Sequence, residues 1–191
     1  MKSEAEIMSV TVGAPDVLNN TIHLADSDPA WPSVFAELEQ EIRHALEDKV
    51  LLLEHVGSTS VPGLSAKPII DMVLAVADSS DESGYVPQLE TIGYVLKIRE
   101  PDWYQHRVLK LQATQANLHV FTSGCEEIER MIAFRDRLRN HPEDLKLYET
   151  TKRKLSQQTW KYLQDYADSK SAVVRKIMER ALLEQNNVLG E

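Results

Sequence analysis

A polar loop between two apolar segments holds the residues best suited to chemistry. The loop spans residues 57–68 and contains two glycines, several hydroxyl side chains and one lysine. Glycine allows a close backbone approach or a positive φ, while hydroxyl, amide and ammonium groups donate hydrogen bonds to an anion. We therefore expect this loop to bind a phosphate-bearing ligand or cofactor through Gly57, Ser58, Thr59, Ser60 and Lys67.

A carboxylate follows the loop. Asp71 lies near the start of the apolar segment 69–77, where an ionised carboxylate is costly unless it is paired or binds a metal. Two interpretations stay open: Asp71 has a metal-binding or catalytic role, or it forms a buried ion pair with Arg107 or Arg135. Phosphate donors followed by such a carboxylate indicate nucleotide chemistry.

Two strands must position this loop. Residues 50–56 and 69–77 are almost continuously apolar, which is typical of buried strands. We expect them to be adjacent central strands of one sheet. Because side chains alternate along a strand, Asp71 and Val73 share a face.

Two later segments also alternate as strands do. Along 103–111, Arg107 lies on the opposite face from His106. In 116–121, His119 falls on the polar face of the predicted strand, where it is a further candidate for a ligand or a hydrogen-bonded core histidine.

Helices account for much of the remaining chain. Apolar residues at helical spacing predict an amphipathic helix over 31–46, preceded by an edge strand at 21–24. Beyond residue 126 the pattern is helical and continues through Trp160 and Tyr166. These elements predict an α/β (α+β) fold with a mixed sheet flanked by helices and a helical C-terminal third.

Length and composition limit the function. With 191 residues, the chain is expected to form one domain over 21–185, with a flexible N-terminal arm at 1–20 and a frayed tail at 186–191. A formal charge of -9 disfavours nucleic acid as a partner. The single cysteine and the lack of a membrane-length apolar run or secretion signal indicate a soluble, cytoplasmic protein. The oligomeric state stays open.

The stretches 54–64 and 66–71 together resemble the signature of the GrpB family. The similarity extends over about residues 22 to 182 and takes in His119 and Arg135. GrpB proteins resemble the nucleotidyltransferase superfamily, whose pattern is a Gly-Ser turn followed by a strand carrying Asp-x-Asp or Asp-x-Glu. The resemblance implies a nucleotidyltransferase-like fold, with Gly57 at the phosphates.

The resemblance also implies a site and a reaction. In a metal-dependent nucleotidyltransferase-like protein, the expected catalytic residues are Asp71, His119 and Lys67. A divalent ion, Mg²⁺ or Mn²⁺, is expected at Asp71 and His119 with help from Glu54 or His55, and the charge that develops on a nucleotide's phosphates would be offset by Lys67, Arg107 and Arg135.

One position departs from the active-enzyme pattern. Val73 stands where the second carboxylate of the Asp-x-Asp pair belongs, so the expected metal site is weakened to one ion at most. The alternative function is therefore a catalytically altered member that acts as a small-ligand-binding or regulatory protein. The sequence leaves open whether turnover occurs and which nucleotide or acceptor is used.

Overall fold

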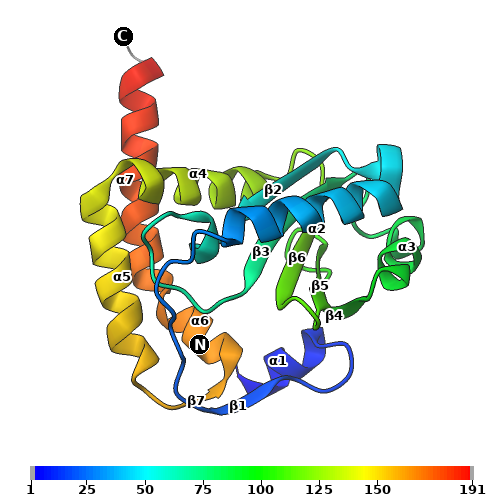
Figure 1. Ribbon diagram of the computed structural model, residues 1–191, viewed down its shortest axis with the longest axis horizontal. Coiled ribbons are helices and arrows are strands. Elements are labelled where there is room, and N and C mark those ends of the chain that lie inside the picture. Colours follow the sequence, from blue (N-terminus) through cyan, green and yellow to red (C-terminus); the bar gives the residue numbers. More distant parts are fainter. Residues whose placement is uncertain (1–2, 190–191) are drawn as a thin grey trace.

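The core of the protein is a mixed five-stranded sheet (Figure 1), seen in a computed structural model that describes residues 3–189. The strand order is β2-β3-β6-β5-β4. Strands β3 and β6 are parallel, and the other neighbouring pairs are antiparallel. The strands are β2 (Leu52–Val56), β3 (Ile70–Val76), β4 (Tyr94–Glu100), β5 (His106–Leu111) and β6 (Ala116–Thr122).

One face of the sheet is covered by α2 (Trp31–Leu46) and α3 (Val86–Thr91). The apolar stripe of α2 recurs at helical spacing, so its buried residues all point at the sheet. Leu38 and Ile42 of this stripe belong to the same core cluster as Met72 and Leu74 of β3. Short 3-10 helices η1 (Glu47–Lys49), η2 (Ser58–Ser60) and η3 (Glu82–Gly84) lie in the connections.

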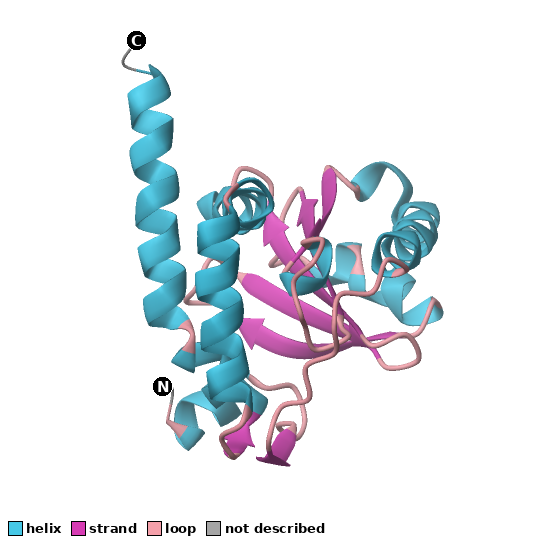
Figure 2. Cartoon of the chain, turned by 60° about the vertical axis from the view of Figure 1, so that its left-hand side comes forward, coloured by secondary structure: helices cyan, strands magenta, loops and turns pink. Residues whose placement is uncertain are grey.

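The opposite face is only partly covered by a helix. There α4 (Glu126–Asn140) packs on Val73 and Ala75. Helices α5 (Pro142–Ser156) and α7 (Ser171–Leu189) lie side by side and pack against α4 (Figure 2). This arrangement confirms the predicted mixed sheet flanked by helices with a helical C-terminal third, and it leaves the β3–β6–β5 part of this face free for a pocket.

The N-terminal segment has regular structure, where the sequence led us to expect a flexible arm. It forms α1 (Glu4–Val10) and β1 (Val17–Asn20), and β1 pairs with β7 (Trp160–Tyr162) in a separate two-stranded sheet. Between α1 and β1, the Val12 amide donates to the Lys97 carbonyl of β4 at 2.8 Å. The partners of this segment are distant in sequence, so local periodicity gives no sign of them.

Three predictions of local structure are wrong. Strand β2 lies at the edge of the sheet, not at its centre, and it is apolar because α2 and α4 cover its two faces. Residues 21–24 form no strand. Trp160 begins β7, and a new helix, α6 (Leu163–Ser169), follows that strand. Of the tail 186–191, residues 186–189 belong to α7, and the last two lie outside the described residues.

Candidate functional site

A pocket of about 750 Å³ lies on the sheet face that is only partly covered by α4. Asp71 of β3, Asn117 and His119 of β6 and Lys110 of β5 form its floor, because alternation along the strands turns these side chains to the same face. Residues of α1, the following segment and α6 form other walls. The pocket therefore collects residues from both ends of the chain.

The Gly57 turn lies directly against Asp71. Gly57 has φ 70° and ψ -170°, a conformation that is almost restricted to glycine. A Cβ atom at this position would be 2.6 Å from Asp71 Oδ2. The other carboxylate oxygen accepts a hydrogen bond of 2.8 Å from Asn117 Nδ2. Glycine is thus required both by the backbone conformation and by the carboxylate next to it.

Three lysines surround Asp71, and we call Lys67, Lys152 and Lys170 the lysine cluster. They come from the loop before β3, from α5 and from the C-terminal end of α6, and all three line the pocket. Burial lowers the pKa of Lys152 to about 7 and that of Lys170 to about 8, and it also lowers the pKa of Lys67. Burial raises the pKa of Asp71, against the hydrogen bond from Asn117 and the charges of the cluster.

Lys152 is the most enclosed member of the cluster, with 2% of its surface exposed. Its Nζ donates hydrogen bonds to Ser58 Oγ at 2.7 Å and to the Ser65 carbonyl at 2.8 Å. The ammonium also lies 5.3 Å from the centre of the Tyr148 ring. These contacts hold the amine against the loop that the sequence singled out.

A chain of polar groups reaches the pocket from β4. Glu100 Oε2 lies 2.8 Å from His106 Nδ1, and His106 Nε2 lies 3.0 Å from His119 Nδ1. Burial lowers the pKa of His119 to about 3, so this histidine is neutral at physiological pH. Trp103 and Phe121 line the pocket beside these rings and give this end an aromatic wall.

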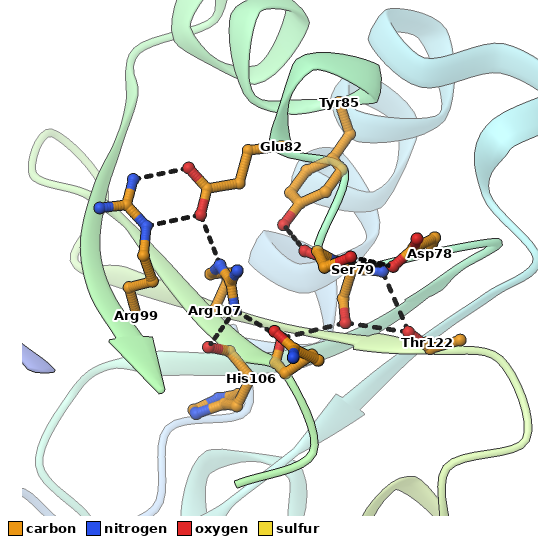
Figure 3. Close-up of polar contacts among 10 residues, drawn as sticks. Asp78, Ser79, Glu82, Tyr85, Arg99, His106, Arg107 and Thr122 are labelled. Carbon is orange, nitrogen blue, oxygen red and sulfur yellow. Dashed lines mark hydrogen bonds and ion pairs between the residues drawn. The ribbon is translucent and has the colours of Figure 1, made fainter. Parts of the chain in front are cut away.

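Arg107, which was expected to contact phosphate, is on the other side of the sheet. Its Nε donates to Glu82 Oε1 at 2.5 Å, and its Nη1 donates to the Gln105 carbonyl at 2.8 Å (Figure 3). Arg99 binds the same Glu82 carboxylate. The geometry therefore gives Arg107 a structural role at the β4–β5 end of the sheet, and not a place in the pocket.

Arg135 and Glu54 pair with each other outside the pocket. Arg135 Nη1 donates to Glu54 Oε2 at 2.7 Å and to the His55 carbonyl at 2.9 Å. His55 itself points to the α2 face, where its ring stacks on Phe35 with 4.9 Å between the centroids. The suggested ion pair between Asp71 and Arg107 or Arg135 does not form, because both arginines are held by glutamates.

The loop hydroxyls divide into two groups. Ser58 lines the pocket, whereas Ser60 donates to the Gly57 carbonyl at 2.6 Å and so stabilises the turn. Thr59 reaches the pocket wall, but its hydroxyl donates to the Ile69 carbonyl at 3.0 Å. Of the predicted anion donors, the structure thus brings Gly57, Ser58, Thr59 and Lys67 to one pocket.

The residues around Asp71 fit an anion better than a divalent cation. Among the described residues 3–189, no three His, Cys, Asp or Glu side chains are grouped so that they could hold a metal ion. Val73 is buried beneath α4, and the charges that act on the pKa of Asp71 are the ammonium groups of Lys170, Lys152 and Lys67. Carboxylate oxygens are the ligands that Mg²⁺ prefers. The Mg²⁺ or Mn²⁺ site at Asp71, His119 and Glu54 stays a prediction, and this donor set does not favour it.

Lys152 and Lys170 are the important residues that the sequence analysis did not place in the site. Lys152 shares the core-facing side of α5 with Tyr148, and a lysine at such a position is a usable signal of a buried polar contact. Lys170 gives no such signal, since only the packing of α6 and α7 brings it to the pocket. His106 and Asn117 could be found from strand alternation with His119.

These features define an α/β domain whose mixed sheet carries a lysine-lined pocket behind a Gly-Ser turn. A family model described as GrpB protein matches residues 21–180, and the chain belongs to the GrpB family. The resemblance drawn from the signature loop is thereby confirmed. No helix within the described residues 3–189 is long and apolar enough to cross a membrane.

Several relatives match most of the chain. A UPF0157 protein of Halalkalibacterium halodurans is 52% identical over 180 residues, which cover 94% of this chain and 92% of the relative. A UPF0157 protein of Streptomyces coelicolor is 41% identical over 170 residues, covering 89% and 88%. The crystal structure of GrpB from Enterococcus faecalis has a TM-score of 0.75 at 32% identity and covers 85% of this chain and 99% of that chain.

A shorter match involves an enzyme. A dephospho-CoA kinase of Mycolicibacterium paratuberculosis is 30% identical over 76 residues, covering 38% of this chain and 19% of the kinase.

Proposed function

We propose that this protein binds a phosphate-bearing small molecule, with a nucleotide as the preferred class, in the lysine-lined pocket. The observation that carries the proposal is the convergence of Lys67, Lys152 and Lys170 on one carboxylate, Asp71. A phosphate dianion placed among these ammonium groups would accept charge-assisted hydrogen bonds, which are the strongest hydrogen bonds available to it.

The electrostatics of the cluster support an anionic ligand. Burial disfavours the charged forms of Lys152 and Lys170, and the carboxylates that act on them, Asp71 on both and Glu149 on Lys152, only partly compensate. A bound dianion would add the missing negative charge and raise both lysine pKa values again. A bound anion would therefore stabilise the charged forms of both lysines.

The end of the pocket away from the lysine cluster could bind the aromatic ring of a ligand. Trp103, His106 and Phe121 present aromatic surface there, and bases stack on such side chains. A nucleotide bound in the pocket would place its phosphates among the lysine cluster and its base against this aromatic surface. The partial similarity to a dephospho-CoA kinase gives a reason to include CoA-type ligands beside nucleoside phosphates in a binding screen.

Nucleotidyl transfer is the second candidate function. The turn at Gly57 and Ser58 lies against Asp71, and the parallel strand β6 returns beside β3, as the nucleotidyltransferase pattern requires. The donor set around Asp71 gives no support to a metal-dependent step. Binding is therefore the primary proposal.

Removing a lysine of the cluster should weaken anion binding. We expect Lys67→Met and Lys170→Met each to lower the affinity for pyrophosphate about tenfold to hundredfold, because one charge-assisted hydrogen bond contributes about 1.5–3 kcal/mol. Isothermal titration calorimetry measures the change. The matched control is Lys154→Met, an exposed lysine on α5 outside the pocket. Equal affinities in all variants would place the anion site elsewhere.

Anion affinity should also fall as pH rises. The lysine cations are present below their pKa values, which burial lowers to about 7 for Lys152 and about 8 for Lys170, and they are lost above them. A phosphomonoester such as AMP is already a dianion above about pH 7, so its own charge does not change. We expect its affinity to fall at least about tenfold between about pH 7 and pH 9.5.

Calorimetry in buffers of different ionisation enthalpy provides an independent measure of the same effect. Near pH 8 the bound anion should raise the lysine pKa values, so binding should take up protons. A constant affinity across this range, together with no proton uptake, would show that neither lysine contacts the anion.

A further inference from the structure

We propose that Ser58 and Lys152 form a serine–lysine pair in which the amine activates the Ser58 hydroxyl as a nucleophile toward an acyl or phosphoryl ester bound in the pocket. Such pairs replace the serine–histidine arrangement in some enzymes. The proposal extends the function of the pocket from binding to covalent group transfer.

The geometry meets the requirements of such a pair. Lys152 Nζ and Ser58 Oγ are 2.7 Å apart, within direct proton-transfer distance. The Ser65 carbonyl accepts a second hydrogen bond at 2.8 Å and fixes the position of the amine. Ser58 follows the sharp turn at Gly57, Lys152 is buried, and both side chains line the pocket. The hydroxyl and its base therefore face the same space in which a ligand would lie.

Without a bound dianion in the pocket, the surroundings favour a neutral Lys152 amine near physiological pH. Burial is the main cause that lowers the pKa of Lys152, and the charge of Lys170 acts in the same direction. Asp71 of the neighbouring strand β3 and Glu149 of α5 itself raise the pKa of Lys152, and Arg153 of α5 lowers it. A neutral lysine has a lone pair that can take the serine proton.

Tyr148 completes the polar environment of Ser58. Its hydroxyl lies within hydrogen-bond reach of the Ser58 side chain, and burial raises its pKa, so it stays protonated. A protonated phenol can donate to Ser58 Oγ, which leaves the serine proton available to Lys152. The three side chains come from η2 and α5, and a rigid helix holds two of them.

The reaction balances without any further co-reactant than water. Ser58 Oγ forms a bond to the carbon or phosphorus of the ester while its proton passes to Lys152, and the bond to the leaving oxygen breaks. Lys152 then gives this proton to the leaving group. Water then attacks the acyl or phosphoryl group on Ser58 while Lys152 takes a proton from the water, and Lys152 returns that proton to Ser58 Oγ as the acid leaves. Lys67 and Lys170 offset the negative charge on the ligand throughout.

The test is covalent labelling of the folded protein with diisopropyl fluorophosphate, read by mass spectrometry of peptides. We expect one adduct, on Ser58, and a labelling rate that rises with pH around the pKa of Lys152, about 7. Ser58→Ala should remove the adduct, and Lys152→Met should slow its formation at least about 100-fold. Lys154→Met, an exposed lysine two positions along α5, should label like the unchanged protein.

Two results would overturn the proposal: no adduct on Ser58, or a Lys152→Met variant that labels within about threefold of the unchanged protein. If Lys152→Met does not fold, the Ser58→Cys variant provides the readout. Its alkylation by iodoacetamide should be fast well below the ordinary thiol pKa of about 8.5, and a pH midpoint at that ordinary value would contradict the pairing. Burst release from p-nitrophenyl acetate or from bis-p-nitrophenyl phosphate distinguishes acyl from phosphoryl transfer.

Failure of this proposal is distinguishable from failure of the proposed binding function. If pyrophosphate binds but Ser58 is not labelled, the pocket is a binding site without this nucleophile. If Ser58 is labelled and pyrophosphate neither binds nor slows the labelling, the proposed nucleophile is supported and the proposed anion site is wrong.

Discussion

The Gly57→Ala variant is expected to lose about 2–6 kcal/mol of unfolding free energy. Alanine would be forced into a backbone conformation that costs about 1–3 kcal/mol for a residue other than glycine. Its Cβ would also meet Asp71 Oδ2 at 2.6 Å and Asp71 Cβ at 2.9 Å, and overpacking of this kind costs a further 1–3 kcal/mol or so. Urea denaturation followed by circular dichroism measures the loss.

Gly63→Ala is the matched control for this effect. Gly63 has φ 79°, also in the left-handed region, but a Cβ atom there would meet nothing within 4 Å. Only the backbone cost applies, about 1–2 kcal/mol. The extra loss in Gly57→Ala reports the contact with Asp71 together with the more restricted backbone conformation of Gly57. Equal losses would mean that the turn can move away from the carboxylate, and the close approach would then not be a fixed feature of the site.

The same glycine should affect binding. Pushing the turn away from Asp71 displaces Ser58 and, through its hydrogen bond, the buried Lys152. We therefore expect Gly57→Ala to lose pyrophosphate binding even where the variant is still folded, while Gly63→Ala keeps it.

The loop and its two strands could be predicted from the sequence because their signals are local. Continuous apolar segments on both sides of a Gly-Ser turn identify two strands and the loop between them. The position of β2 could not be predicted, because an apolar strand covered on both faces looks the same at the edge of a sheet as at its centre. Partners that are distant in sequence decide this, and they also decided the structure of residues 3–20.

Arg107 and Lys170 show two different limits of prediction for the site. Alternation along 103–111 already separated Arg107 from the His106 face, yet the family resemblance suggested a phosphate contact, and the geometry agrees with the alternation. Lys170 carried no local signal, because a lysine at a helix end is ordinarily solvated. Only the packing of the C-terminal helices places its charge near Asp71.

Asp71→Asn separates anion binding by lysines from binding through a metal ion. Asparagine keeps the shape and can still accept the hydrogen bond from Asn117, but it removes the carboxylate that acts on all three lysines, Lys67, Lys152 and Lys170. In the presence of a metal chelator we expect the affinity for pyrophosphate to rise about tenfold, because the repulsion between ligand and carboxylate disappears. A metal-bridged site requires the opposite result, since Asp71 would be its principal ligand.

The measurement is calorimetric titration of pyrophosphate into the unchanged protein, Asp71→Asn and Asp48→Asn. Each protein is titrated once with a metal chelator and once with Mg²⁺ or Mn²⁺. Asp48→Asn is the control, because it makes the same change in net charge at an exposed position in η1 outside the pocket. Its affinity should stay at the value of the unchanged protein. If the unchanged protein binds only with Mg²⁺ or Mn²⁺, and Asp71→Asn abolishes this binding, then Asp71 is a metal ligand. The lysine cluster would in that case support the phosphates of a metal-bound nucleotide.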